Sequence, residues 1–392
     1  MRLLRASITL VTLAAAALLG GGPTATAGPS ATAAPAPYGP PMPLLSHCRS
    51  SMPPADATIA SDGTVRGFAN CIHNESGEIL FFRYRAGAVL SQPTPYTGRL
   101  IKAAWDGLNS TYVLFTRAVA DTRGEALFIG KRLDNTGQFA PATVLTTYPR
   151  DFPNALRPIQ AALVASAGKW WAIWAEPTAE VAGTHTYSLF QRHTLLGVQS
   201  RTRITYPPTG ADDSAPSLAY SLPSLQPTLG RLTAIWVRSP YLGAPRGQLT
   251  LGQEFGYGWE RGWFRISTPV DRPTYVDQIS YTGVRHLTWP GNHSVGVLST
   301  DKSPIPAPTI FPADSDVVSS TVAVSGQNLF LMWCTSSGPN GPQVILAERQ
   351  SDTWSHATVL PAASAAVRVL AQGGKGRLVY WDNDNLMLRI QS

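Results

Sequence analysis

Charged side chains are scarce in this chain: Asp, Glu, Lys and Arg make up 14% of its residues, against roughly 25% in an average soluble domain. Long exposed helices need charge on their outer faces, so this scarcity argues against a largely helical protein. The cations exceed the anions by 7, but they are scattered along the chain. Nucleic-acid binders gather basic residues on one face or helix, so no nucleic-acid partner is expected.

The motifs of several large enzyme classes are also missing. There is no Gly-x-Ser-x-Gly elbow, no His-Glu-x-x-His motif, no Cys-x-x-Cys pair and no phosphate-binding glycine loop. The two short runs with several metal-ligand types are His73-Asn74-Glu75 and residues 382–385. We interpret them as a solvated loop and a tight hairpin, because Asx residues are common in turns and the glutamate of a calcium loop is absent. No metal ion and no cofactor is expected.

Cysteine is rare, and its odd number, 3, allows at most one pair within the chain. The pair nearest in sequence, Cys48 and Cys71, is favoured because it would tie the segment that enters the fold to the first repeat. A pair between Cys71 and Cys334 is the alternative. Cys334 follows Trp333 in an apolar run, which is typical of a small buried core residue.

The N-terminal region has the pattern of an export signal. Basic residues come first, an apolar stretch at 8–19 is too short to cross a bilayer comfortably, and a small-x-small cleavage site ends at Ala27. Residues 1–27 are therefore predicted to be a signal peptide, with a second possible cleavage site ending at Ala33. A retained membrane anchor is the alternative. We expect a secreted, extracellular protein that leaves the membrane after cleavage.

Composition changes after this signal. Residues 28–43 are mostly Ala, Pro, Thr, Gly and Ser, which cannot bury enough apolar surface to fold. They are predicted to be a disordered linker, and residues 44–392 the folded domain. The chain as a whole holds 34 Gly and 33 Pro, so turns are frequent, and all-β folds of this length often form one domain.

One strand-like pattern recurs along the folded part. The run Arg-Leu-Thr-Ala-Ile-Trp-Val-Arg-Ser at 231–239 is apolar up to a Trp and is followed by polar residues and a turn, and similar runs lie at 112–117, 170–176, 329–335 and 377–382. Counted from a weaker first copy at Asn70, the aromatic residues that end these runs recur every 44 to 62 residues: Phe115, Trp174, Trp236, Trp289, Trp333 and Trp381. Repeats of about 40–50 residues with four strands each are typical of a β-propeller.

We therefore predict an all-β protein, a seven-bladed β-propeller of four-stranded antiparallel blades. A six-bladed propeller and a pair of β-sandwiches are the alternatives, although a sandwich needs no fixed period. The seventh repeat is incomplete, and a ring must close without an open strand edge. Residues 44–52 are predicted to supply its outer strand, so that deletion of 28–55 would destroy folding whereas deletion of 28–43 would not.

Polar residues cluster at two kinds of loop that a propeller brings to one face. Arg117, Glu176, Arg238 and Asp382 follow the organising aromatics. A second set precedes the innermost strands: Arg150, Asp151, Asp212, Asp213, Asp271, Arg272, Asp314 and Asp316. Together they predict a polar binding site, with Glu176, Asp213 and Asp271 as candidate acid–base groups. The alternative is that the Asp residues cap the turns before each blade.

The chain is rich in tryptophan, with 11 residues. Most of them end apolar strands and are expected in the core between blades. Trp259 and Trp263, in the run Tyr-Gly-Trp-Glu-Arg-Gly-Trp, are expected to be partly exposed. They are the best aromatic candidates for contact with a ligand.

The repeat pattern resembles secreted bacterial β-propellers of the sialidase-like type. Residues 351–354, Ser-Asp-Thr-Trp, resemble the Asp-box hairpin of that family but lack its Gly and its spacing. The resemblance implies the architecture. A sialidase also needs three converging arginines, for which Arg117, Arg238 and Arg272 are the available set, and no local motif supports that activity. Fucose-type propeller lectins are a comparable analogy, and fold alone does not imply function in either case.

These observations predict a monomeric protein that binds an extracellular ligand through its loop face. A carbohydrate or cell-wall polymer is the favoured ligand. The alternatives are a glycoside hydrolase or lyase that uses the acidic and Arg residues of that face, and a scaffold for protein–protein contacts.

Overall fold

The computed structural model describes most of the chain after its N-terminal region. The described residues are 38–48, 54–71, 77–119, 124–148, 158–181, 184–194, 201–221, 231–241, 244, 246–254, 264–271, 276–281, 284–300, 306–337, 341–360 and 363–392. Within them every regular element is a β-strand. The predicted signal peptide and most of the predicted linker lie outside these residues, so both stay predictions.

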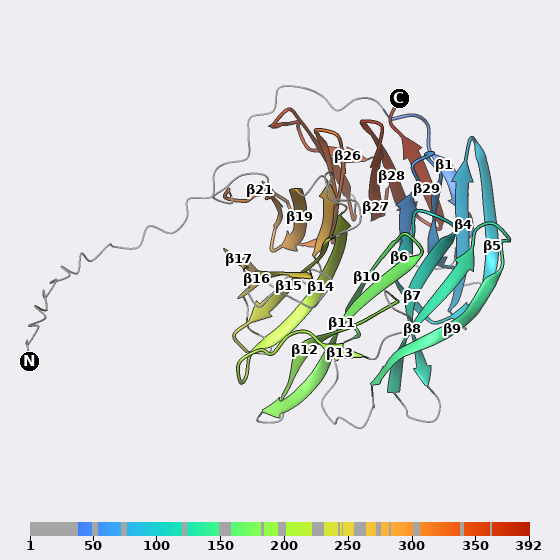
Figure 1. Cartoon of the computed structure of the whole chain (residues 1–392). Helices are drawn as coiled ribbons and strands as arrows, with labels where there is room; N and C mark the ends of the chain where they lie inside the picture. Colours follow the sequence, from blue (N-terminus) through green and yellow to red (C-terminus); the bar gives the residue numbers. More distant parts are fainter. Residues whose placement is uncertain are drawn as a thin grey trace, which may run out of the picture.

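The strands form seven antiparallel sheets arranged as blades around one axis (Figure 1). Blade 1 contains β2 (Ala55–Ile59), β3 (Val65–Asn70), β4 (Glu78–Arg85) and β5 (Ala88–Thr97). Blade 2 contains β6 (Arg99–Trp105), β7 (Ser110–Val119), β8 (Gly124–Leu133) and β9 (Phe139–Tyr148). Blade 3 contains β10 (Ala161–Ser166), β11 (Lys169–Val181), β12 (Thr184–His193) and β13 (Thr202–Arg203).

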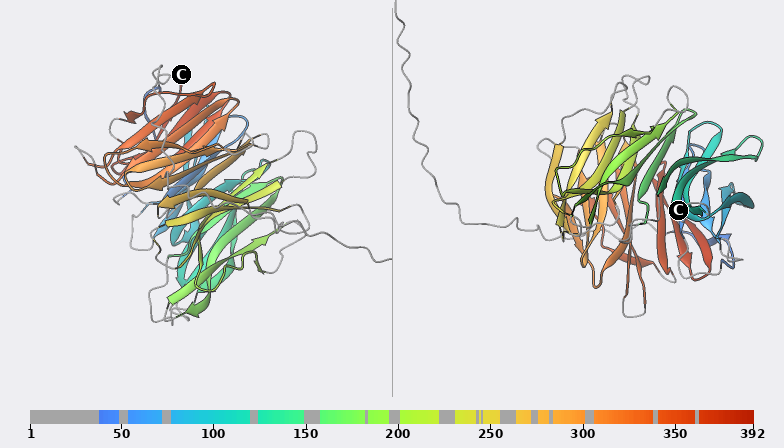
Figure 2. Two further views of the ribbon diagram at one scale, coloured as in Figure 1. Left: turned by 90° about the vertical axis from the view of Figure 1, so that its left-hand side faces the viewer. Right: turned by 90° about the horizontal axis from the view of Figure 1, so that it is seen from below.

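The remaining four blades follow in chain order (Figure 2). Blade 4 contains β14 (Asp212–Ser221), β15 (Arg231–Ser239), β16 (Arg246–Glu254) and β17 (Phe264–Asp271). Blade 5 contains β18 (Asp277–Tyr281), β19 (Val284–Gly291), β20 (Ser294–Ser299) and β21 (Thr309–Pro312). Blade 6 contains β22 (Val317–Ser325), β23 (Asn328–Thr335), β24 (Val344–Gln350), β25 (Thr353–Trp354) and β26 (Thr358–Leu360). Blade 7 contains β27 (Ala365–Gln372), β28 (Lys375–Asp382), β29 (Asn385–Ile390) and, from the start of the chain, β1 (Met42–Leu45).

The seven-bladed ring predicted from the repeats is therefore confirmed. The Asp-box-like run forms a tight hairpin between β24 and β25, with Ser351 and Asp352 both at positive φ. Blade 5 forms a complete four-stranded sheet although Pro290 lies within its second strand. In six blades the strand nearest the axis comes first in the chain and the outermost strand last; in blade 7 the outermost strand comes from the other end of the chain.

The organising tryptophans lie in the apolar layers between blades. Trp174, Trp236, Trp333 and Trp381 are among the largest fully buried side chains. Trp236 of blade 4, for example, packs with Trp171 and Ile173 of blade 3. A second strand that is covered on both sides by neighbouring blades must be apolar on both faces, which explains the uninterrupted apolar runs. Truncation of such a core Trp to Ala costs about 3–5 kcal/mol.

The ring closes through the pairing of its two ends. β1 runs antiparallel to β29, with Met42 opposite Leu388, and Tyr38 forms a bridge with Gln391. The predicted closing strand is therefore present, but its pairing starts before residue 44. The predicted boundary between linker and domain lies too late, because Met42 and Pro43 already belong to a strand. A tract rich in Pro and Ala can still add a strand to a sheet edge.

A disulfide joins the closing segment to blade 1. Cys48 pairs with Cys71, with their Cα atoms 4.6 Å apart, and Cys334 is a buried free thiol. The bond connects blade 7, through β1, to the end of β3 in blade 1. It therefore spans the seam where the ring closes.

Candidate functional site

The predicted loop-face residue Glu176 is held within the protein. Its Oε2 accepts hydrogen bonds from Trp174 Nε1 at 2.9 Å and from Thr146 Oγ1 at 3.2 Å. Its Oε1 lies 3.1 Å from a guanidinium nitrogen of Arg201. The carboxylate thus satisfies the indole N–H of an organising tryptophan. These contacts with the protein itself, on a side chain that is only 11% exposed, make this a structural arrangement.

Asp213 and Arg238 repeat this arrangement in blade 4. Arg238 donates to both carboxylate oxygens of Asp213, at 2.8 and 2.9 Å, and Trp236 Nε1 donates to Asp213 Oδ1 at 3.1 Å. Asp213 is fully buried. A buried carboxylate that already binds an arginine in a bidentate manner has little capacity left for a ligand.

The other predicted site residues are dispersed. Arg117 is exposed and stacks on Phe128 at 4.7 Å, and Asp382 closes the two-residue hairpin between β28 and β29, as the sequence indicates. Asp271 is the last residue of β17, and its side chain is not described. Arg272, Trp259 and Trp263 lie outside the described residues, as do Arg150 and Asp151.

Two of the remaining aspartates, Asp212 and Asp316, also contact the protein itself, and Asp314 is exposed. Asp212 Oδ1 accepts the backbone N–H of Tyr187 at 3.2 Å, and Asp316 lies 3.7 Å from His293 Nε2 in an exposed pair. The described residues of the loop face therefore do not converge on one polar site. The contact of Asp212 joins blade 4 to β12 of blade 3, so it is structural, although it is not the turn cap that the alternative expects.

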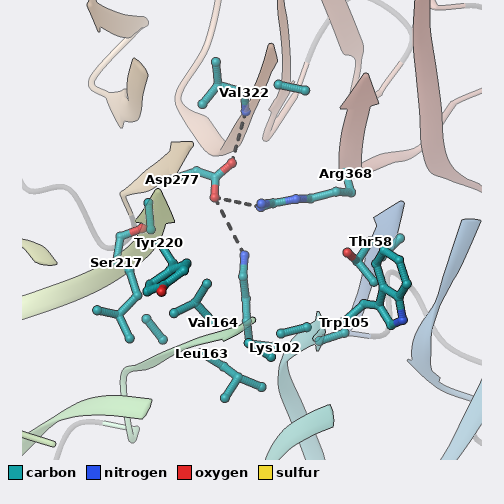
Figure 3. A pocket seen from close by; sticks show the side chains of 18 of the residues that line it. Thr58, Lys102, Trp105, Leu163, Val164, Ser217, Tyr220, Asp277, Val322 and Arg368 are labelled. Carbon is teal, nitrogen blue, oxygen red and sulfur yellow. Dashed lines mark hydrogen bonds and ion pairs between the residues drawn. The ribbon is translucent and has the colours of Figure 1, made fainter. Parts of the chain in front are cut away.

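The cavity that stands out lies on the axis instead. It has a volume of about 280 Å³, and its walls come from the inner strands of all seven blades: β2, β6, β10, β14, β18, β22 and β27 (Figure 3). Small side chains make room for it, including Ala57, Ala103, Ala161 and Ala165. Its volume falls near the lower end of small-molecule sites, roughly 300–1,000 Å³.

Four charged side chains cross the channel at one end of this cavity. Asp277 Oδ1 accepts a hydrogen bond from Arg368 NH1 at 2.7 Å and lies 3.7 Å from Lys102 Nζ (Figure 3). Asp56 lies 3.7 Å from the same Lys102 Nζ and 3.9 Å from Arg368 Nε. The four residues come from blades 1, 2, 5 and 7, so the cluster links opposite sides of the ring. We call it the axial cluster.

The axial carboxylates also fasten neighbouring blades. Asp56 Oδ2 accepts the backbone N–H of Ala103, and Asp277 Oδ2 accepts that of Val322 at 3.1 Å. Burial alone would raise the pKa of Asp277, but Arg368 and Lys102 outweigh it and hold this pKa below its ordinary value. Asp277 is therefore an anion at neutral pH. Lys102 and Arg368 keep 16% and 14% of their side chains exposed.

Two aromatic rings line the other end of the cavity. Trp105 ends β6 and Tyr220 lies near the end of β14, and both are half-buried (Figure 3). Arg66 stacks on Trp105 with 4.7 Å to the ring centroid, and Trp171 stacks on Tyr220 with 4.9 Å between centroids. The cavity thus combines a charged end with an aromatic end.

None of the axial residues was among the sequence-derived site residues. The available signal was a charged side chain flanked by small or apolar residues inside an inner strand, as at Lys102 and Arg368. This signal was ambiguous, since only the ring geometry shows that residues of blades 1, 2, 5 and 7 meet at one point.

The described residues contain no group of three or more His, Cys, Asp or Glu side chains that could hold a metal ion. The same part of the chain has no helix long and apolar enough to cross a membrane.

Comparison with known proteins gives the fold and no family. No family model and no curated protein matches the chain. Among solved structures, it is similar to an α-L-arabinanase of Penicillium chrysogenum complexed with arabinobiose, at 10% identity and a TM-score of 0.54, covering 79% of this chain and 98% of that one. A polysaccharide lyase matches at 10% identity and 0.52, covering 86% and 90%. An α-L-arabinofuranosidase of Fusarium graminearum matches at 10% identity and 0.52, covering 82% and 98%.

Proposed function

We propose that this protein is an exported propeller that binds carbohydrate in its axial cavity. The observation that carries the proposal is the convergence of Lys102, Arg368 and Asp277 on a cavity of about 280 Å³ that also has aromatic walls. Sugars present hydroxyl groups to charged donors and acceptors and apolar ring faces to aromatic side chains, so both ends of the cavity suit them. The three propellers named above act on carbohydrates according to their descriptions, which supports this class of ligand.

The charge state of the cluster favours binding over hydrolysis. Glycoside hydrolysis uses a carboxylic acid whose pKa is raised, so that it can protonate the leaving group. The Arg368 and Lys102 cations lower the pKa of Asp277 instead, against the effect of its burial. The described carboxyl group with a raised pKa is Glu348, which hydrogen-bonds Tyr38 and Gln391 near the ring closure rather than in the cavity.

A glycoside hydrolase or lyase is the second candidate. It is favoured by one observation: the cavity end contains two carboxylates, Asp56 and Asp277, that both lie 3.7 Å from one lysine. Paired carboxylates are the usual equipment of glycosidases. The test of the proposal therefore includes a measurement of turnover.

The test uses the secreted mature chain on a glycan array, followed by calorimetric titration with the glycans that bind. Arg368→Gln is expected to weaken binding at least about tenfold, or 1.4 kcal/mol, because it removes a donor that faces the cavity. Arg238→Gln is the matched control, since Arg238 also binds a buried aspartate but not in the cavity. The affinity of the Arg238→Gln variant for the glycan is expected to equal that of the unchanged protein.

Two outcomes would contradict the proposal. No binding to any glycan by a folded protein would favour a protein–protein scaffold. Hydrolysis or elimination of a bound glycan, abolished in Asp277→Asn, would favour the enzyme. Export is tested separately by N-terminal sequencing of protein from the culture medium, where a start at residue 28 or 34 is expected and a retained residue 1 would contradict it.

A further inference from the structure

We propose that the cavity takes a neutral terminal sugar residue, which reaches it from the hairpin end of the ring and contacts Trp105 and Tyr220. The hairpin end is the end at which each inner strand turns into the second strand of its blade; the loop end is the opposite one. This inference rests on the proposed carbohydrate binding and specifies its direction and chemistry. It differs from the sequence-based expectation, which places the ligand at the loop end.

The direction follows from where the cavity lies along the inner strands. Asp277 is the first residue of β18 and pairs with Thr288, toward the loop end. Trp105 pairs with Thr111, and Tyr220 with Leu232, next to the turns at the hairpin end. On β2, β6 and β27 the lining residues run from the level of the axial cluster toward these turns, while Val276 and Ala161 extend the wall a short way toward the loop end. The cluster therefore lies toward the loop end of the cavity and the two rings toward its hairpin end.

Exposure separates the aspartates from the other cavity residues. At the cluster, Asp56 is 5% and Asp277 1% exposed, whereas Lys102 and Arg368 keep 16% and 14% of their side chains exposed. Toward the hairpin end, Ile59, Trp105 and Tyr220 are half-buried. The two cations and the two rings are therefore accessible, while the aspartates that hold the cations are covered.

The two rings are already held in place. One face of Trp105 is occupied by the Arg66 guanidinium at 4.7 Å, and Tyr220 stacks on Trp171 with 19° between the ring planes. Side chains that are fixed before binding lose little conformational entropy when a ligand arrives. Flat rings fixed at the wall of a small cavity suit the apolar face of a sugar ring.

The neutrality of the ligand follows from charge balance. Among the described side chains of the cluster, Asp56 and Asp277 carry two negative charges and Lys102 and Arg368 carry two positive ones, joined by ion pairs. A uronate or phosphate would have to separate a cation from its aspartate, which leaves a buried charge unpaired at a high cost. Hydroxyl groups donate to carboxylates and accept from cations without breaking the pairs. The volume of about 280 Å³ suits a single residue at the end of a chain.

The direction is tested with two tyrosines at opposite ends of blade 4. Tyr220→Ala removes a ring at the hairpin end, and Tyr241→Ala removes an exposed ring, 55% accessible, that follows β15 toward the loop end. Calorimetric titration with a glycan selected on the array is expected to show a loss of about tenfold for Tyr220→Ala and none for Tyr241→Ala. Tyr220→Phe and Trp105→Phe keep an aromatic ring at each position. Their affinities for the glycan are expected to stay within about threefold of that of the unchanged protein.

The chemistry is tested with pairs of probes. Arabinose, xylose, glucose and galactose, free and as terminal residues of oligosaccharides, are compared with glucuronate and galacturonate by tryptophan fluorescence. At least one neutral sugar is expected to bind about tenfold or more tightly than either uronate. Thermal unfolding of each variant shows whether it is folded.

The outcomes separate this inference from the proposed function. A loss of affinity in a folded Tyr241→Ala but not in Tyr220→Ala, or a preference for the uronates, would overturn the inference while carbohydrate binding stands. Absence of binding to every probe and every array glycan would overturn both.

Discussion

Two pairs of buried carboxylates in this protein look alike by charge and differ by position. Glu176 lies two residues beyond the organising Trp174, Asp213 lies opposite Arg238, and each binds an indole N–H and an arginine. Asp213 stands in the inner strand β14, as Asp56 and Asp277 stand in theirs, but its partners Trp236 and Arg238 belong to the second strand of its own blade. Asp56 and Asp277 instead bind backbone N–H groups of the next blade and two cations that face a cavity. In a ring of blades, only inner-strand side chains can meet partners from opposite blades. The partners that each carboxylate binds, within its own blade or across the axis, rather than burial or charge, separate the binding candidates from the structural carboxylates.

The largest expected effect compares Asp277→Asn with Asp213→Asn. Each change removes one partner of a buried ion pair, so each is expected to lower the free energy of unfolding by about 3–5 kcal/mol. Only Asp277→Asn is expected to weaken carbohydrate binding as well. Urea denaturation measures the first quantity and calorimetric titration of the folded variants the second. Equal losses of affinity in both would remove the distinction between the two positions.

The next effect concerns the disulfide at the ring closure, which does not line the cavity. Replacing Cys48 and Cys71 together with Ser removes the disulfide at the ring closure and is expected to cost about 3 kcal/mol of unfolding free energy. Affinity for carbohydrate is expected to stay unchanged, because the bond does not line the cavity. Urea denaturation with and without reductant checks the first expectation. If a reductant lowers the free energy of unfolding of the double variant as much as that of the unchanged protein, the effect is not due to this bond.

A smaller effect is expected for Glu176→Gln. The amide oxygen can still accept from Trp174 Nε1, whereas the contact with the half-exposed Arg201 loses its charge. A cost of about 1 kcal/mol is expected, with binding unaltered. A tenfold fall in affinity, or loss of a turnover present in the unchanged protein, would return Glu176 to the group of functional residues.

The smallest effect is a pH dependence at Glu348, another buried carboxyl group, which lies where Tyr38 and Gln391 close the ring. Burial raises the pKa of Glu348, and hydrogen bonds from Tyr38 and Gln391 offset this only in part. A raised folded-state pKa means that this contribution to stability is complete below the ordinary value of 4.5 and is lost as the pH rises through the raised pKa. Stability is therefore expected to fall over that window in the unchanged protein and less in Glu348→Gln.

Thermal unfolding of both proteins between about pH 4 and pH 8 gives this comparison. Asp62→Asn is a useful control, because Asp62 is an exposed carboxyl group whose pKa is lowered mainly by the backbone N–H of Thr64. Its removal should change the profile only at more acidic pH. Parallel profiles for the unchanged protein and Glu348→Gln would contradict the assignment.

Much of the fold could be predicted from local pattern. Apolar runs ending in Trp174, Trp236, Trp333 and Trp381 predict second strands covered on both faces, and their period predicts seven blades. The incomplete last repeat predicts closure by the N-terminal segment, although the pairing at Tyr38 and Met42 starts earlier than composition suggests. A run of Pro and Ala lacks the usual strand pattern, so its pairing depends on the free edge of β29.

The sequence by itself determined the strands, their order and the layers between blades, because these depend on the spacing of apolar side chains along short stretches. Only the tertiary structure decided which charges meet. Asp56, Lys102, Asp277 and Arg368 belong to four blades, and their contact requires the register of each inner strand and the curvature of the whole ring. Glu176 and Asp213 support the same conclusion. A nearby tryptophan donates a hydrogen bond to each carboxylate, and no sequence motif shows the direction in which a side chain points.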